Sequence, residues 1–127
     1  MNLLLDTCSF LWLISDSPAF PESARCIYQE AEHVYISVIS EWEIAIKHSL
    51  GRLPLPSIPN EYIPGQRMKH EVESLPLYEQ AALHVSVLPD IHKDPFDRML
   101  VSQAIIHGLT ILSPDSVFRS YPAPVCW

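Results

Sequence analysis

Two carboxylates lie close together at the predicted start of a helix. Asp94 precedes Pro95, as expected for a helix N-cap followed by proline at the first helical position, and Asp97 then falls at the third helical position. Acids at these positions stabilise a helix N-terminus through capping and the helix dipole. Because capping alone explains the pair, a role in chemistry depends on where the other acids of the chain lie.

The residues that follow this pair have the spacing of a core-facing helix. Apolar side chains recur at Phe96, Leu100, Val101, Ala104 and Ile105. Gly108 can close this helix, because glycine readily adopts the left-handed conformation found at helix ends. The pattern therefore predicts a helix that holds Asp97 at its N-terminal end.

Two further acids follow short apolar segments that are typical of buried strands. Asp6 comes directly after Asn2–Leu5, and Asp115 comes after Leu109–Leu112 and the intervening Ser113 and Pro114. Asp115 has an alternative explanation, because it could cap a turn in the residues that follow it. Thr7 can cap the helix expected after the first strand.

Another acid falls on a helix predicted from Val38 to Leu50, which follows a short strand and is capped by Ser37. Glu43 lies at the edge of the apolar face of this helix, whereas Glu41 is turned further away from it. The predicted apolar face consists of Val38, Ile39, Trp42, Ala45, Ile46 and Leu50.

The remaining elements alternate between strands and helices. Helices are expected over 10–14, 22–32 and 77–85, and strands over 34–36 and 71–75. Residues 52–64 are expected to form a loop with at most a short helix after Asn60, and the tail a last strand fragment. Such alternation predicts a single α/β domain over residues 1–127, with a short central parallel sheet flanked by helices. Ligands of such sheets gather at the carboxyl ends of the strands, where Asp6 and Asp115 fall.

Composition limits the possible partners and compartments. The chain has 127 residues, a net charge of −7 and three cysteines, and no close cysteine pair suggests a disulfide. The N-terminus has no signal-peptide features and no segment is apolar enough to span a membrane, so we expect a cytoplasmic protein. The negative charge argues against a large basic nucleic-acid surface, although divalent cations held by carboxylates would reverse the local sign.

The four or five acids could converge on one pocket. Like charges at close range cannot all remain ionised without a cation, and oxygen ligands favour Mg²⁺ or Mn²⁺. The order of Asp6-Thr7, Glu43 within Trp42-Glu43-Ile44-Ala45-Ile46-Lys47, His92-Lys93-Asp94-Pro95-Phe96-Asp97-Arg98 and Ser113-Pro114-Asp115 resembles the PIN-domain family, and more narrowly its VapC-type toxins.

This resemblance implies an Mg²⁺-dependent endoribonuclease, with Mn²⁺ as a possible substitute. Asp6, Glu43, Asp97 and Asp115 would be the catalytic acids, and Asp6 and Asp97 would bind the metal directly. A metal-activated water would cleave the RNA backbone and leave a 5′-phosphate and a 3′-hydroxyl. The supporting residues would be Asp94, Thr7, Ser37 and Ser113, and the candidate RNA contacts are Lys47, Arg52, Lys93 and Arg98.

The same resemblance implies a cognate antitoxin and a homodimer, and the lack of a long apolar segment predicts no membrane partner. An alternative of a different class is a non-catalytic protein-binding module whose acidic pocket docks a basic partner segment. The two hypotheses differ in the expected effect of Asp97→Asn. A nuclease should lose turnover, whereas a docking site should show only weaker partner binding.

Overall fold

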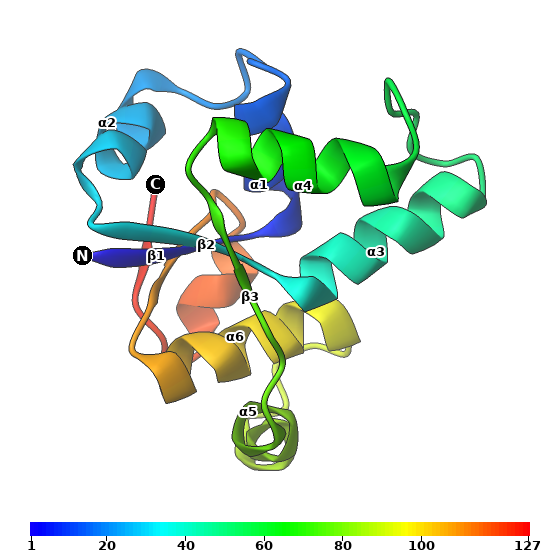
Figure 1. Ribbon diagram of the computed structural model, residues 1–127. Helices are drawn as coiled ribbons and strands as arrows, with labels where there is room; N and C mark the ends of the chain where they lie inside the picture. The colour runs from blue at the N-terminus through cyan, green and yellow to red at the C-terminus, as the bar shows by residue number, and fades with distance from the viewer.

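A five-stranded parallel sheet forms the centre of the structure, a computed structural model that describes all residues 1–127 (Figure 1). The strand order is β3-β2-β1-β4-β5. The strands are β1 (Asn2–Leu5), β2 (His33–Ser37), β3 (Glu73–Leu75), β4 (Thr110–Leu112) and β5 (Val125–Cys126). The expectation of a short parallel sheet with helices around it is therefore confirmed.

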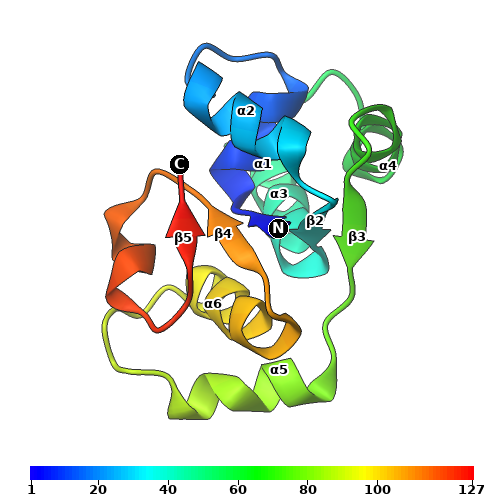
Figure 2. The ribbon, with the colours of Figure 1, turned by 90° about the vertical axis from the view of Figure 1, so that its left-hand side faces the viewer.

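Helices cover both faces of this sheet (Figure 2). They are α1 (Thr7–Ile14), α2 (Glu22–Glu30), α3 (Val38–Ser49), α4 (Pro59–Lys69), α5 (Glu79–His84) and α6 (Pro95–His107), with 3₁₀ turns η1 (Val85–Val87) and η2 (Ser116–Ser120). Side chains alternate along β1, so that Leu3 and Leu5 join the core under α1, α2 and α4, whereas Leu4 joins the core under α6. No helix has the length and apolar composition that a membrane crossing requires.

The pairing of the central strand determines what lies at the carboxyl edge of the sheet. Leu5 pairs with Ile36 of β2 and with Leu112 of β4. The next residues along these three strands are Asp6, Ser37 and Ser113. The register therefore places Asp6 between Ser37 and Ser113 at this edge.

The start of α6 agrees with the predicted cap. The Asp94 carboxylate accepts hydrogen bonds from the backbone N–H groups of Phe96 and Asp97, and Pro95 occupies the first turn. Gly108 ends the helix with a φ of 67°. Of the predicted apolar positions, Leu100, Val101 and Ala104 are buried in the core.

The start of α1 differs from the prediction. Asp6, rather than Thr7, is the N-cap, because its backbone is extended and its carboxylate accepts from the backbone N–H of Ser9. Thr7 is the first residue of the helix.

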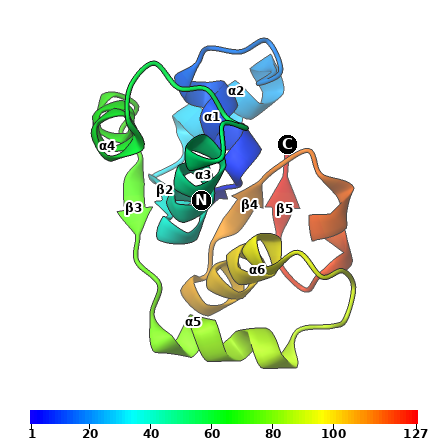
Figure 3. The same cartoon turned by 90° about the vertical axis from the view of Figure 1, so that its right-hand side faces the viewer.

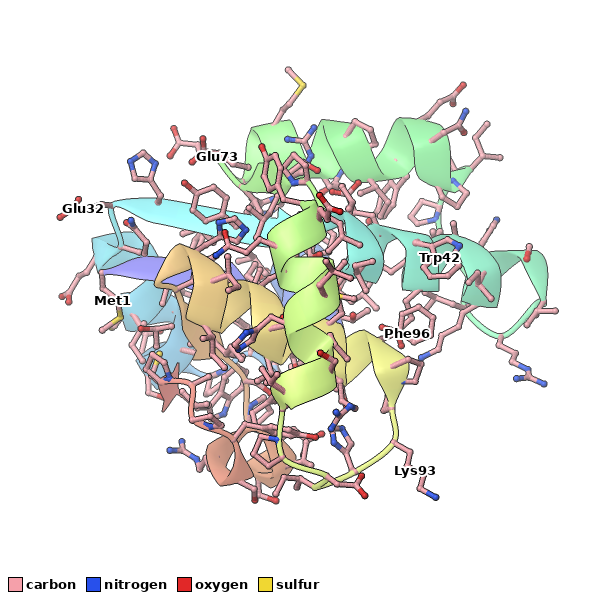
Figure 4. The ribbon with its side chains drawn as sticks, turned by 90° about the horizontal axis from the view of Figure 1, so that it is seen from below. Met1, Glu32, Trp42, Glu73, Lys93 and Phe96 are labelled. Carbon is pink, nitrogen blue, oxygen red and sulfur yellow. The ribbon has the colours of Figure 1, made fainter.

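The predicted apolar face of α3 was wrong. Trp42 and Leu50 are 58% and 59% exposed, whereas Ser40 and Ile44 are fully buried. The helix leaves the sheet edge and packs between α1 and α6, as Figure 3 shows, so a face that includes the small Ser40 side chain fits closely against Thr7. Trp42 instead packs edge to face on Phe96, with ring centroids 5.5 Å apart (Figure 4).

The segment from 52 to 64 was expected to be mainly a loop, but its end forms part of α4. Pro59 lies in the first turn, where the missing backbone N–H has no helical partner to lose. Pro64 lies inside the helix and leaves one hydrogen bond unmade. Burial of Ile63 in the core offsets this loss.

Two glycines provide a test of the local backbone. We expect Gly108→Ala to lower the free energy of unfolding by about 1 kcal/mol, because Gly108 has a left-handed backbone with a φ of 67°. Gly65→Ala, inside α4, should raise it by about 0.5 to 1 kcal/mol through helix propensity. An added Cβ meets no atom within 4 Å at either site, so steric clash does not confuse the comparison. Urea unfolding of both variants measures the two changes in the free energy of unfolding. Equal changes would contradict a left-handed backbone at Gly108 and a helical backbone at Gly65.

Candidate functional site

Asp6 is the most deeply placed acid of the site. It is 7% exposed, and its Oδ1 atom accepts from the Ser9 backbone N–H at 2.8 Å. Its Oδ2 atom accepts from the Ser113 hydroxyl at 2.6 Å. Burial raises the pKa of Asp6, the hydrogen bonds from Ser113 and Ser9 oppose this rise, and the charge of Asp115 adds to it.

Asp97 occupies the first turn of α6, facing the same edge of the sheet. Its side chain is 26% exposed, and its Oδ2 atom lies 3.3 Å from His92 Nε2. Burial, followed by the charge of Asp94, raises the pKa of Asp97 to about 6, and the hydrogen bond from His92 opposes the rise. The Asp94 carboxylate alone caps the helix, which leaves the Asp97 side chain free for another role.

Glu43 reaches the site from α3. Its Oε1 atom accepts from the Thr7 hydroxyl at 2.7 Å, and Thr7 Oγ1 also lies 2.9 Å from the Ser40 hydroxyl. Its Oε2 atom pairs with Lys47 Nζ at 2.7 Å, one helical turn further along. The side chain of Glu43 is only 12% exposed. Thr7 therefore holds it against the start of α1, and Lys47 holds it along its own helix.

Asp115 joins the group from the turn after β4. It caps η2 by accepting from the Val117 backbone N–H, as the capping alternative anticipated. Its own backbone N–H donates to Ser113 Oγ at 3.0 Å, while Ser113 Oγ donates to Asp6. The charge of Asp115 adds to the rise in the pKa of both Asp6 and Asp97.

The supporting hydroxyls divide into two groups. Ser113 and Thr7 each donate to a candidate catalytic acid, as described above. Ser37 is turned away from the acids, because its buried hydroxyl donates to Gln103 Oε1 and also accepts from the Ile39 backbone N–H. Ser37 thus links the start of α3 to α6.

Cys8 and His92 belong to the neighbourhood of the site, although the sequence analysis gave neither a role. Cys8 is an exposed residue. Partial burial of its thiol is the largest cause of a raised pKa, and the charges of Asp6, Glu43 and Asp97 add to the rise. The position of Cys8, two residues after Asp6 on the first turn of α1, was the available signal. His92 contacts Asp97 through a fold in the preceding loop, for which the sequence carries no periodic pattern.

The candidate cations around the site differ in availability. Lys47 pairs with Glu43, while Arg52 and Lys93 are exposed, and Lys93 projects into solvent in Figure 4. Arg98 points into the protein, where its guanidinium donates to the carbonyl oxygens of Pro89 and Val85. The backbone contacts of Arg98 explain its presence without a ligand.

The donor set fits a hard divalent cation of the magnesium type. Burial raises the pKa of Asp6 and Asp97, and the charge of Asp115 adds to both rises, so a cation at this edge would relieve the repulsion. No three His, Cys, Asp or Glu side chains lie close enough to form a complete metal cage. Mg²⁺ commonly takes only one or two protein carboxylates and fills its other positions with water, so a cage is not needed.

The raised pKa of Asp97 predicts a pH-dependent stability difference. The folded state binds the Asp97 proton more tightly, so this group lowers stability as pH rises from about 4 to 6. With EDTA present, Asp97→Asn should therefore be more stable than wild type at pH 7.5, by at most about 3 kcal/mol, and nearly equal to it at pH 4.

Asp90→Asn is the matched control for this comparison, because it makes the same change in charge at an exposed loop position. Chemical denaturation at the two pH values gives the differences from wild type. An Asp97→Asn protein no more stable than wild type at pH 7.5 would show that the carboxylate is not strained by its surroundings.

Comparison with known proteins agrees with this architecture. The PIN domain family model matches residues 3–124. Similar solved structures include VapBC2 from Rickettsia felis bound to a promoter DNA fragment, with TM-score 0.73, 14% identity and coverage of 99% of this chain and 98% of that chain. DNA-bound VapBC from Salmonella typhimurium has a TM-score of 0.72 and 20% identity, with coverage of 99% of this chain and 97% of that chain. A toxin–antitoxin complex from Klebsiella pneumoniae has a TM-score of 0.65 and 15% identity, with coverage of 98% of this chain and 96% of that chain.

The search of curated proteins finds no match. The structural likenesses are at low identity and support the fold alone, whereas the family model spans almost the whole chain. Together with the parallel sheet and the acids at its carboxyl edge, that match shows that the chain belongs to the PIN domain family.

Proposed function

We propose that this protein is an Mg²⁺-dependent endoribonuclease and the toxin of a type II toxin–antitoxin pair. The observation that supports this most directly is the link between Asp6 and Asp115 through Ser113, with Glu43 bonded to Thr7, the residue that follows Asp6. Burial and the charge of Asp115 raise the pKa of both Asp6 and Asp97, and a bound cation would stabilise their charged forms.

Each acid has a role that follows from its surroundings. Asp6 and Asp97 would hold Mg²⁺ or Mn²⁺ directly, whereas Glu43 and Asp115 would accept hydrogen bonds from coordinated water. The bound cation supplies a water of lowered pKa and neutralises charge on the phosphate. Ser113 and Thr7 fix the carboxylates of Asp6 and Glu43. No side-chain nucleophile is required.

Lys47, Arg52 and Lys93 are the cations available to an RNA backbone in this proposal. Lys47 lies beside Glu43, and Lys93 lies on the loop that leads into α6. Arg98 is a weaker candidate, because its guanidinium is held by backbone carbonyls. A few cations at the RNA-binding surface are compatible with the net charge of −7, since phosphate contacts need only a local positive field.

A cognate antitoxin is the proposed protein partner. The similar structures from Rickettsia felis and Salmonella typhimurium are VapBC complexes. On this chain, an apolar groove of about 210 Å³ lies between α1 and the segment before α4 and offers a surface for such a partner. Its apolar lining residues are Leu11, Ile14, Leu53, Leu55 and Tyr62.

We also propose a homodimer in the cytoplasm. Large apolar side chains are exposed along α5 and its flanks, at Tyr78, Leu83 and Val87. Such a group of exposed apolar residues is typical of a protein interface. The absence of a cysteine pair that would indicate a disulfide agrees with a reducing compartment.

Cleavage of total RNA by the purified protein tests the nuclease proposal. We expect discrete products with Mg²⁺ or Mn²⁺ and none with EDTA. Asp6→Asn and Asp97→Asn should each lower the rate by on the order of a hundredfold or more, because each removes a charged group that the transition state needs. Gel electrophoresis of end-labelled RNA measures the rates.

The control is Asp90→Asn, an exposed change of the same kind away from the acids, which should cleave like wild type. Products that persist in both active-site variants would come from a contaminant and would contradict the proposal. Loss of partner affinity in Asp97→Asn, with no cleavage by folded wild type, would instead favour the protein-docking alternative.

A further inference from the structure

A chain of four polar side chains runs from the interior of the protein to Asp97. Arg98 Nη1 donates to the Tyr121 hydroxyl at 3.1 Å, and that hydroxyl lies 2.6 Å from His92 Nδ1. On the other side of the imidazole, His92 Nε2 lies 3.3 Å from Asp97 Oδ2. The members come from the loop before α6, the first turn of α6 and the end of η2.

The direction of this chain follows from its first member. A guanidinium is always a donor, so the Tyr121 oxygen accepts from Arg98. Tyr121 has one hydrogen of its own, and the nearest acceptor is His92 Nδ1. A neutral imidazole that accepts at Nδ1 carries its hydrogen on Nε2. That hydrogen points to Asp97 Oδ2.

Arg98 and Tyr121, at the inner end of this series of hydrogen bonds, are held by several contacts. Arg98 also donates to the Pro89 carbonyl at 2.8 Å and to the Val85 carbonyl at 3.3 Å. Tyr121 is 4% exposed, and its ring packs edge to face on His92 with centroids 5.5 Å apart. Neither side chain can turn away without losing several contacts, so the imidazole keeps one orientation.

Asp97 depends on this imidazole for its own orientation. The Asp97 carboxylate accepts one hydrogen bond within the protein, from His92. It accepts none from the start of α6, where the Asp94 carboxylate is the cap. Oδ2 is therefore engaged, and Oδ1 is the oxygen left without a protein partner.

From this arrangement we propose that His92 is a positioning residue for Asp97. Arg98 and Tyr121 hold its neutral ring as the Nε2–H tautomer, and the ring in turn orients the Asp97 carboxylate so that Oδ1 can bind a divalent cation. The cation-binding part rests on the proposed function, whereas the tautomer does not. Such outer partners of a metal ligand fix its orientation and change metal affinity when they are removed.

Nitrogen-15 NMR of the whole chain tests the tautomer without any metal. At about pH 8.5 with EDTA, where an ordinary histidine is neutral, His92 should show a protonated Nε2 and an unprotonated Nδ1. Absence of the signal in His92→Gln assigns it among the six histidines. Tyr121→Phe removes one of the two groups that fix the tautomer and should raise the Nδ1–H fraction, although the acceptor Asp97 remains. An Nδ1–H tautomer in wild type would overturn the chain of donors.

A titration with Mn²⁺ in the absence of RNA tests the positioning role. The EPR signal of free Mn²⁺ measures how much of the ion remains unbound. His92→Leu should weaken binding by on the order of tenfold. His92→Gln keeps an N–H donor near the Nε2 position and should restore affinity to within about threefold of wild type. His33→Leu is the control, because His33 is exposed and pairs with Glu73 away from the acids.

The outcomes separate the two proposals. Equal Mn²⁺ affinity in wild type and His92→Leu would overturn the positioning role, even with the tautomer as expected. No Mn²⁺ binding by wild type would overturn the proposed metal-dependent function, and with it the role of His92 toward a cation, while the tautomer result would stand by itself.

Discussion

The parallel pairing of β1 with strands on both sides is the constraint on which the candidate site depends. Asp6 follows the middle strand of the five, so its carboxylate leaves the sheet between Ser37 and Ser113 rather than into solvent. Its burial is costly for a charge, and the hydrogen bonds from Ser9 and Ser113 reduce that cost. A shift of the β4 register by one residue would turn Ser113 to the other face and leave Asp6 buried with one partner fewer.

The other acids are held by short local interactions on elements that start at this edge. Glu43 is fixed to α1 by Thr7 and along its own helix by Lys47. Asp97 is released from capping by Asp94 and is oriented by His92. The charges of the group are therefore arranged before any ligand arrives, which reduces the reorganisation that binding requires.

The elements that were predictable from the sequence are those determined locally. The N-cap Asp94, Pro95 at the first position of α6 and the left-handed Gly108 follow from backbone chemistry that is readable within a few residues. The acids after β1 and β4 were placed correctly because parallel strands end on one edge.

The wrong predictions concern residues whose exposure or orientation depends on contacts with distant parts of the chain. The hydrophobicity of Trp42 and Leu50 does not distinguish a core position from an exposed one on a helix that extends past the sheet. Prolines suggested a loop where Pro59 in fact begins α4. Ser37 was expected beside the acids, but Gln103 of α6 draws its hydroxyl away. The link from His92 to Tyr121 spans a segment of chain that carries no pattern.

The order in which the strands occur along the chain has a consequence for synthesis. The strand β1 is made first, but its neighbour β4 and the serine that bonds to Asp6 lie near the opposite end of the chain. The bond from the Ser9 backbone N–H to Asp6 is local, whereas during translation the Asp6 carboxylate lacks its Ser113 partner until the residues after β4 have been made. The contact is of high sequence separation and closes late in folding, because its loop-closure entropy is large. A nascent chain that ends before β4 would thus lack Asp115 and the bond from Ser113 to Asp6, so the site is assembled only after this strand has been made.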